Sequence, residues 1–183
     1  MSLKFFVNYT QNNLWNIFCI KDNSLEKGFW MLIAKKEAPA AKVYFENGDK
    51  VVGMIAVNVQ LLIYTDKLES IKGILSECEN VFKQESKLTC IVVSSDSFDV
   101  IESFVSDNSI IKIEFYKDSQ SQFKTRFKIK DESIGVFLVD KEGILEYVYY
   151  GDSASLDTKN IIQNAVELAN RKQKGHTHEN WMM

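Results

Sequence analysis

One stretch constrains the fold more than any other: residues 133–152, with the sequence SIGVFLVDKEGILEYVYYGD. Residues 134–139 form an almost continuous apolar run, which is typical of a strand buried on both faces. Residues 145–150 are rich in aromatic and β-branched side chains, which suit a partner strand. Between the two runs, Asp140 can form an Asx turn and Gly143 can adopt a positive φ. The stretch therefore predicts a β-hairpin that leads into a C-terminal helix.

Apolar strands alternate with helices upstream of this hairpin. Residues 58–64 and 88–93 are predicted to be buried strands, because both are short apolar runs bounded by turn or capping residues. Residues 66–84, between them, are predicted to form a helix, because their apolar side chains recur at three- and four-residue spacing and share one stripe. The stripe consists of Leu68, Ile71, Leu75, Cys78 and Phe82.

The alternation continues toward the hairpin. A helix is predicted after the strand at 88–93, with Ser95 or Asp96 capping its first amides. Residues 110–115 are predicted to be the next strand, and residues 118–127 suit either a short helix or an extended loop. Residues 156–168 are predicted to form the last helix, which would cover one face of the sheet.

A second hairpin is predicted further upstream, at residues 42–45 and a strand that begins at Lys50. Asn47 and Gly48 lie between these runs, and Asn-Gly between two β-rich runs is a strong hairpin signal.

Together these elements predict an α/β fold: a three-layer α/β/α sandwich with a mixed sheet and a closing antiparallel hairpin. Alternating strands and helices give parallel neighbours with right-handed crossovers, whereas a hairpin adds antiparallel strands. In this sheet we expect residues 58–64 to be central, with 88–93 parallel to them and 134–139 antiparallel.

The sequence predicts one domain with two extensions. Residues 37–172 form the domain, residues 1–36 an extension that packs on it, and residues 173–183 a flexible tail. Residues 3–20 suit a hairpin or a strand followed by a short helix, and residues 28–34 suit a strand or a buried helix. The extension is rich in large apolar rings, which are costly to leave in water. They include Phe5, Phe6, Trp15, Phe18, Phe29 and Trp30.

Composition and charge exclude several classes of function. A net charge of −3 and a pI near 5.5 argue against a nucleic-acid-binding protein, which needs clustered lysine and arginine. No run approaches the roughly 18 consecutive apolar residues of a membrane span. Residues 1–13 also lack the apolar core of a secretory signal. We therefore expect a cytoplasmic protein that binds neither nucleic acid nor membrane.

Few residues could carry metal or thiol chemistry. Cys19, Cys78 and Cys90 are widely separated, unlike a disulfide framework or a zinc-ligand pattern. His176 and His178 stand in the predicted tail, where a pair of imidazoles is a weak ligand set compared with the three or four ligands of a zinc site. We expect no metal and no cofactor.

Three motifs give the sequence a resemblance to a known family. The final hairpin, FLVDKEGILEYVYYG, resembles the pattern F-x-I-D-x-x-G-x-I-x-Y. Ala38 and Pro39, with Gly48, resemble the entry segment A-P-x-F-x-L-x-D-x-x-G-x-x-V, and SSDS resembles V-S-x-D-S. Over residues 37–170 the chain thus resembles peroxiredoxin and thioredoxin-like proteins of the alkyl-hydroperoxide-reductase and thiol-specific-antioxidant type. The resemblance implies a thioredoxin-like fold with peroxiredoxin-type strand order.

The resemblance is degenerate at the catalytic positions. The family places a cysteine in the first turn of the helix after the central strand, in the pattern Pro-x-x-x-Thr/Ser-x-x-Cys, where backbone amides and the helix dipole favour a thiolate. Here these positions fall on Thr65, Glu69 and Lys72. The arginine that the family places before the final hairpin falls on Ile134.

A shift of one residue puts Ser70 at the Thr/Ser position and Gly73 at the cysteine position. Cys78 then lies five residues further on, where some family members carry a resolving cysteine. The same residue lies on the apolar stripe of its predicted helix, which favours a buried core position.

We therefore expect a peroxiredoxin-like protein that has lost peroxidase activity and serves as a binding or structural module, with an unknown protein partner or as a homodimer. The alternative is a thiol-dependent oxidoreductase or peroxidase in which Cys78 is the catalytic residue. Acidic pairs, such as Glu77 with Glu79 or Asp131 with Glu132, are interpreted as solvated faces and not as acid–base groups.

Overall fold

The computed structural model describes residue 32, residues 34–46 and residues 48–171. Its strands are β1 (Ala41–Phe45), β2 (Gly48–Val52), β3 (Val59–Thr65), β4 (Leu88–Ser94), β5 (Ile113–Lys117), β6 (Ile134–Val139) and β7 (Leu145–Gly151). Its helices are α1 (Lys72–Phe82), α2 (Phe98–Asp107), α3 (Gln122–Arg126) and α4 (Thr158–Asn170), with short 3-10 helices η1 (Leu68–Ile71) and η2 (Ser153–Ser155).

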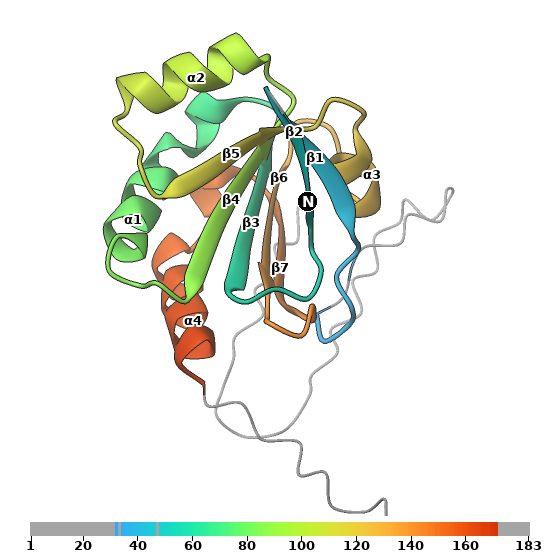
Figure 1. Ribbon diagram of the computed structural model, residues 1–183, viewed down its shortest axis with the longest axis vertical. Helices are drawn as coiled ribbons and strands as arrows, with labels where there is room; N and C mark the ends of the chain where they lie inside the picture. Colours follow the sequence, from blue (N-terminus) through green and yellow to red (C-terminus); the bar gives the residue numbers. More distant parts are fainter. Residues whose placement is uncertain (1–31, 33, 47, 172–183) are drawn as a thin grey trace, which may run out of the picture.

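The strands form one mixed sheet of seven strands in the order β2-β1-β5-β4-β3-β6-β7 (Figure 1). β3 is central, parallel to β4 and antiparallel to β6, so that Leu62 lies opposite both Ile91 and Phe137. Every residue of β3 is buried, because helices or loops cover both of its faces. The prediction for residues 58–64, 88–93 and 134–139 is confirmed.

Helices cover the two faces of the sheet unequally. α1, α2 and α4 pack on one face, to the left in Figure 1, and enclose a core that includes Leu61, Leu75 and Ile161. The other face is covered by short α3 and the residues after it. There the rings of Phe123 and Phe127 stack with centroids 4.1 Å apart. The predicted α/β/α sandwich is therefore confirmed.

The closing hairpin forms as predicted. Asp140 follows β6, and its Oδ1 accepts hydrogen bonds from the N–H groups of Glu142 (3.0 Å) and Ile144 (2.7 Å), which is an Asx turn. Gly143 has a φ of 82°, in the left-handed region that side-chain-bearing residues rarely adopt. Turn chemistry and strand pattern thus agree, and β7 pairs antiparallel with β6.

At two of the boundaries that differ from the prediction, side chains from distant segments bond to the backbone. The helix predicted over residues 66–84 begins as η1 and continues as α1, although its apolar stripe is buried as expected. The strand predicted over residues 110–115 is β5 and begins only at Ile113. The amides of Ile111 and Lys112 instead donate to the buried carboxylate of Glu79.

The cap of α2 also differs. Ser97, and neither Ser95 nor Asp96, is the N-cap, and its hydroxyl accepts a hydrogen bond from the N–H of Val100 (3.4 Å). The carboxylate of Asp96 instead accepts a hydrogen bond from the N–H of Leu68 (3.1 Å), at the start of η1. The segment between β4 and α2 is therefore linked to the start of η1.

The predicted N-terminal extension is described only from residue 32 onward, with residue 33 left out. Leu32 packs against the core beside α3, and the N–H of Leu145 donates to the carbonyl of Lys36 (2.8 Å) at the start of β7. The six aromatic side chains named above lie outside the described residues, as does the tail at 173–183. The division into an extension, a domain and a tail stays a prediction.

Candidate functional site

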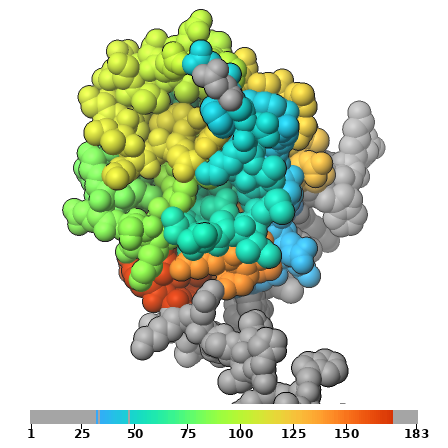
Figure 2. Space-filling view, viewed as in Figure 1, coloured from blue at the N-terminus to red at the C-terminus, as the bar shows by residue number. Residues whose placement is uncertain are grey.

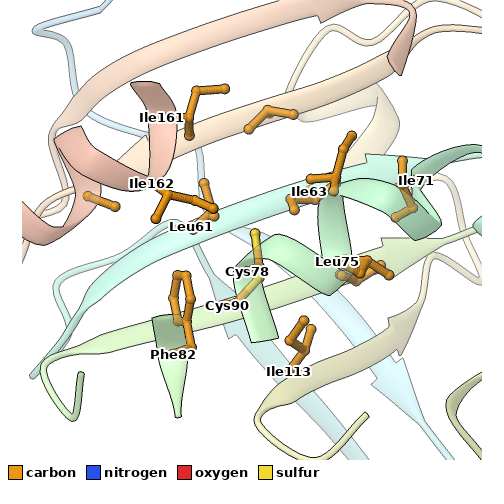
Figure 3. Close-up of a cluster of buried hydrophobic side chains, with 14 of the residues drawn as sticks. Leu61, Ile63, Ile71, Leu75, Cys78, Phe82, Cys90, Ile113, Ile161 and Ile162 are labelled. Atoms are coloured by element: carbon orange, nitrogen blue, oxygen red, sulfur yellow. The ribbon is translucent and has the colours of Figure 1, made fainter. Parts of the chain in front are cut away.

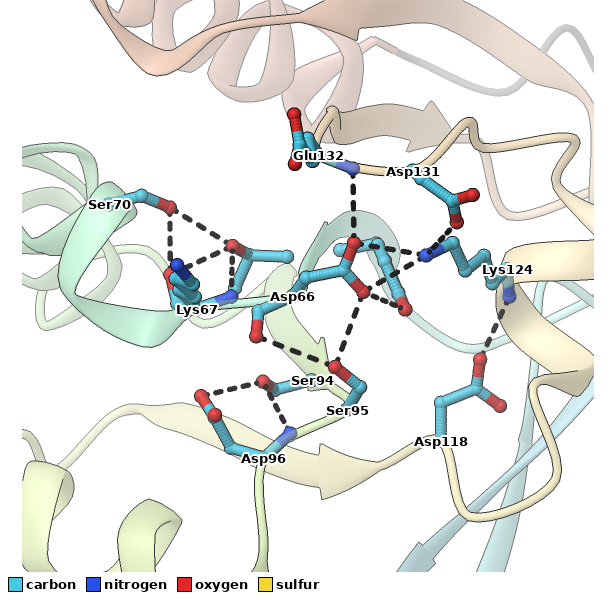
Figure 4. A network of polar contacts seen from close by, with 12 residues as sticks. Asp66, Lys67, Ser70, Ser94, Ser95, Asp96, Asp118, Lys124, Asp131 and Glu132 are labelled. Atoms are coloured by element: carbon cyan, nitrogen blue, oxygen red, sulfur yellow. Dashed lines mark hydrogen bonds and ion pairs between the residues drawn. The ribbon is translucent and has the colours of Figure 1, made fainter.

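Polar side chains from four segments meet at the carboxyl ends of β3 and β4 (Figure 4). Asp66 directly follows β3, Ser95 directly follows β4, and Lys124 projects from α3. Residues 131 and 132 precede β6, which runs antiparallel and so begins at this end of the sheet. We name these residues the Asp66 cluster: Tyr64, Asp66, Ser95, Lys124, Asp131 and Glu132.

The carboxylate of Asp66 is the centre of this cluster. It accepts hydrogen bonds from the hydroxyl of Tyr64 (2.8 Å), the hydroxyl of Ser95 (3.2 Å) and the Nζ of Lys124 (3.0 Å). The N–H of Glu132 adds a longer contact at 3.3 Å. Burial alone would raise the pKa of Asp66, but the hydrogen bonds from Lys124 and Tyr64 outweigh it and hold the pKa below its usual value. Asp66 is therefore ionised at neutral pH.

Lys124 is held in place by the way α3 begins. The carboxylate of Asp118 accepts from the N–H groups of Phe123 (3.0 Å) and Lys124 (2.9 Å), and the N–H of Asp118 donates to the carbonyl of Ser94 (2.8 Å). The ammonium of Lys124 contacts Asp66 and also Asp131, at 2.9 Å. Burial would lower the pKa of Lys124, but these carboxylates raise it. The ammonium therefore stays charged and cannot serve as a nucleophile near neutral pH.

Tyr64 points from β3 into the same cluster. Burial, together with the hydrogen bond and charge of Asp66, raises the pKa of Tyr64. Its ring stacks on Phe123, with centroids 5.9 Å apart. The phenol is thus a fixed hydrogen-bond donor to Asp66 and not a base.

The first amides of η1 bond to side chains of the chain itself. The hydroxyl of Thr65 accepts from the N–H of Lys67 (3.1 Å), and the carboxylate of Asp96 accepts from the N–H of Leu68 (3.1 Å). Ser94 donates to Asp96 at 3.1 Å. Backbone amides at this kind of helix start stabilise a thiolate in thiol enzymes. Here they bond to a hydroxyl and a carboxylate.

The positions that the resemblance assigns to catalysis are dispersed in the structure. Glu69 and Lys72 are exposed on η1 and α1, and Gly73 has nothing within 4 Å of where a Cβ would lie. Ile134 is buried at the start of β6. Thr65 is buried and bonds to Ser70 at 3.0 Å.

The two described cysteines lie in the core between α1 and the sheet (Figure 3). Cys78 and Cys90 each have a relative exposure of 0%. They lie side by side, and the contact with Cys78, together with burial, raises the pKa of Cys90 well above its usual value. Cys19 lies outside the described residues, as do His176 and His178. The expected core position of Cys78 is confirmed, and Cys90 lies in the buried strand β4.

The interpretation of the acidic pairs as solvated faces is wrong for Glu79. Glu77 is exposed, but Glu79 is buried, with a relative exposure of 6%. Sequence reasoning missed this role because the amides that it binds are 32 residues or more away. Asp131 is largely exposed yet forms an ion pair with Lys124.

Sequence reasoning also missed the Asp66 cluster. The position of Asp66 directly after a buried strand was a usable signal, because the carboxyl ends of parallel strands gather functional side chains. Within the described segments, no group of three or more His, Cys, Asp or Glu side chains is arranged to hold a metal ion. No helix in the same segments is long and apolar enough to cross a membrane.

No family model matches the sequence, and no curated protein sequence matches it. Solved structures do match the fold. A peroxiredoxin-like protein from Aquifex aeolicus superposes with a TM-score of 0.68 at 19% identity, over 75% of this chain and 88% of that chain. A thiol peroxidase from Chromobacterium violaceum gives a TM-score of 0.63 at 14% identity, over 75% and 88%. AhpC from Mycobacterium bovis gives 0.60 at 10% identity, over 83% and 99%. The chain therefore has a thioredoxin-like fold of the kind found in peroxiredoxins.

Proposed function

We propose that this chain is a thioredoxin-fold protein without thiol peroxidase activity, and that it serves as a binding or structural module. The observation that supports the proposal is which side chains lie at the carboxyl end of β3. An ion pair between Asp66 and Lys124 lies there, whereas Cys78 and Cys90 lie in the core. The partner is an unidentified protein or a second copy of the chain. Buried thiols are in keeping with a cytoplasmic setting.

The chemistry of peroxide reduction explains why this arrangement argues against the activity. A thiolate must attack one peroxide oxygen, form an S–O bond and release the other oxygen as water or alcohol, so it needs access and a low pKa. Cys78 has no access, and Cys90 has a raised pKa as well. Lys72, at the position of the family's cysteine, carries no thiol.

The Asp66 cluster supports a structural or binding role for the same end of the molecule. It ties the ends of β3 and β4 to α3 and to the segment before β6, through charge-assisted hydrogen bonds. Four segments are thereby held in one arrangement. A rigid surface of this kind suits recognition, because little conformational entropy is lost on binding.

The alternative is a thiol-dependent peroxidase or oxidoreductase that uses Cys78. The observation in its favour is the contact between Cys78 and Cys90, which places two thiols beside each other. This reaction would require local opening of α1, because both side chains are fully buried.

Thiol reactivity separates the two functions. The reduced protein should reduce hydrogen peroxide no faster than a free thiol, and Cys78→Ser should leave that rate unchanged. Iodoacetamide labelling across pH, read by mass spectrometry, should modify Cys78 and Cys90 only slowly in the folded protein and readily in denaturant. Rapid labelling of Cys78 below about pH 7, well under the usual thiol pKa near 8.5, would establish the peroxidase alternative.

Two further measurements complete the test. The variant Cys19→Ser identifies any reactivity that arises from the third cysteine, and peroxide reduction that disappears only in this variant would also contradict the proposal. Sedimentation over a range of protein concentrations tests the homodimer. A monomer at every concentration would leave a different protein as the partner.

A further inference from the structure

A surface pocket lies at the opposite end of the sheet from the Asp66 cluster, beside the amino-terminal ends of β3 and β4. It has a volume of about 220 Å³, and the segment between β2 and β3 forms much of its wall. Four of its lining residues are polar, namely Lys50, Asn58, Gln60 and Thr89, and six are apolar. The apolar residues are Val51, Met54, Ile55, Ala56, Val57 and Ile91.

Several hydrogen bonds hold the segment that bears these side chains. Gln60 accepts from the N–H of Gly53 (3.3 Å) and donates to the carbonyl of Met54 (2.9 Å). The N–H of Ala56 donates to the carbonyl of Lys141 (3.2 Å), in the turn between β6 and β7. Asn58 donates to the hydroxyl of Thr89 at 3.2 Å. The segment therefore has a defined conformation.

Its apolar side chains are nevertheless exposed to solvent. Met54, Ile55 and Val57 have relative exposures of 52%, 80% and 89%, and Val51 is exposed beside them. Clustered exposure of this kind, on an anchored backbone and next to a pocket, is typical of a docking surface. Isolated exposed apolar residues would need no such explanation.

The end of α4 contacts the segment just before β4, on the face of the sheet opposite to Ile91 of the pocket. The side chain of Asn170, at the end of α4, accepts from Lys87 Nζ (3.1 Å) and donates to Glu85 (3.2 Å). Lys87 lies two residues before Thr89, which lines the pocket. In Figure 2 the surface of the segment after β2, coloured teal, and that of α4, coloured red, lie at the same lower end of the molecule.

We propose that the segment after α4 folds back over the end of the sheet and places Trp181 and Met182 in this pocket. Trp181 follows Asn170 by eleven residues, a length that spans up to about 36–40 Å when extended. The segment starts at Asn170, whose side chain contacts the residues just before β4. A span of this length is therefore sufficient to reach the pocket. An indole ring and a thioether suit an apolar pocket that also contains polar groups.

Residues 1–31 are the other segment that could reach this surface, but they join the core elsewhere. The N–H of Leu32 donates to the hydroxyl of Tyr150 (3.4 Å). Tyr150 pairs with Gly135, which pairs with Tyr64 at the carboxyl end of β3. The segment after α4, in contrast, starts at the end of the sheet that holds the pocket. The proposal concerns a different surface from the Asp66 cluster and does not depend on the proposed function.

Methionine methyl resonances provide the test, because the sequence has only five methionines and Met54 lies in the pocket. In the full-length protein with isotope-labelled methionine methyl groups, Trp181→Leu should shift the Met54 signal, because the ring current of the indole is lost. The shift should be the same after dilution of the protein. Met54→Leu assigns the signal.

The reverse experiment uses the pocket wall. Val57→Ser should shift the signals of Met182 and Met183, whereas Val100→Ser, at an exposed position of α2 at the other end of the sheet, should not. An unchanged Met54 signal in Trp181→Leu overturns the proposal. A shift that disappears on dilution also overturns it, because the occupant would then be a second copy of the chain. A Met54 shift caused only by Trp15→Phe or Trp30→Phe overturns it as well, because the occupant would then be residues 1–31.

Discussion

Asp66 and Lys124 are 58 positions apart in the sequence, yet their side chains form an ion pair of 3.0 Å at the carboxyl end of β3. Both side chains are mostly covered, with relative exposures of 29% and 19%. The pair connects the end of the central strand to α3, the one helix on that face of the sheet among the described residues. Its contribution to stability and its pH dependence can be measured directly.

Replacing Lys124 by methionine should lower the free energy of unfolding at pH 7 by about 1 kcal/mol, a value kept small because solvent partly screens the pair. The pKa of Asp66 is lowered in the folded protein, so its contribution is present above the usual carboxyl pKa near 3.9. That contribution is lost as the pH falls through the lowered pKa. Urea unfolding should therefore show a smaller difference between Lys124→Met and wild type at pH 3 than at pH 7.

The matched control is Arg126→Met, on the exposed side of the same helix, which should change stability little at either pH. A difference for Lys124→Met that is equally large at both pH values would contradict the assignment of the effect to the charge of Asp66.

Glu79→Ala should destabilise the protein by about 1–3 kcal/mol, because the amides of Ile111 and Lys112 lose their buried acceptor. Glu77→Ala, on the exposed face of the same helix, is the control and should have little effect. Chemical denaturation of both variants measures the difference. Equal losses for the two would show that Glu79 contributes only helix propensity.

Two glycine-to-alanine changes should have opposite signs. Gly143→Ala should cost about 1–2 kcal/mol, because alanine is strained in the left-handed region. Its Cβ would also lie 3.2 Å from the backbone nitrogen of Ile55. Gly73→Ala should stabilise by about 0.5–1 kcal/mol, because Gly73 lies within α1 and its Cβ would meet open space. Thermal unfolding of both variants tests this prediction. A lower melting temperature in both variants would contradict the expected difference in sign.

Deleting residues 1–34 should destabilise or precipitate the protein. The deletion removes the aromatic-rich segment, and fully burying a large apolar side chain contributes roughly 1.5–3 kcal/mol. It also removes Leu32, which packs on the core beside α3. A second deletion, of residues 1–31, retains Leu32 and separates the two contributions. If that shorter deletion melts at the temperature of the full chain, the predicted packing of the extension is wrong.

Local patterns carried most of the fold prediction. The strands at 58–64, 88–93 and 134–139 were predictable because each is a short, mostly apolar run, and the closing hairpin was predictable from Asp140 and Gly143. The burial of Cys78 followed from the stripe on its helix. Two of the boundaries that differed, at η1 and before Ile113, are places where a distant carboxylate accepts hydrogen bonds from the backbone.

The sequence by itself therefore determined the order, type and buried faces of the central elements, because apolar periodicity and turn chemistry act between neighbouring residues. Only the tertiary structure decided that Asp66 contacts Lys124, that Glu79 is buried, and that Met54, Ile55 and Val57 are exposed beside a pocket. Each of these features depends on how segments far apart in the chain are brought together. The residues next to a carboxylate or an isoleucine in the sequence are the same whether or not a distant segment covers that side chain.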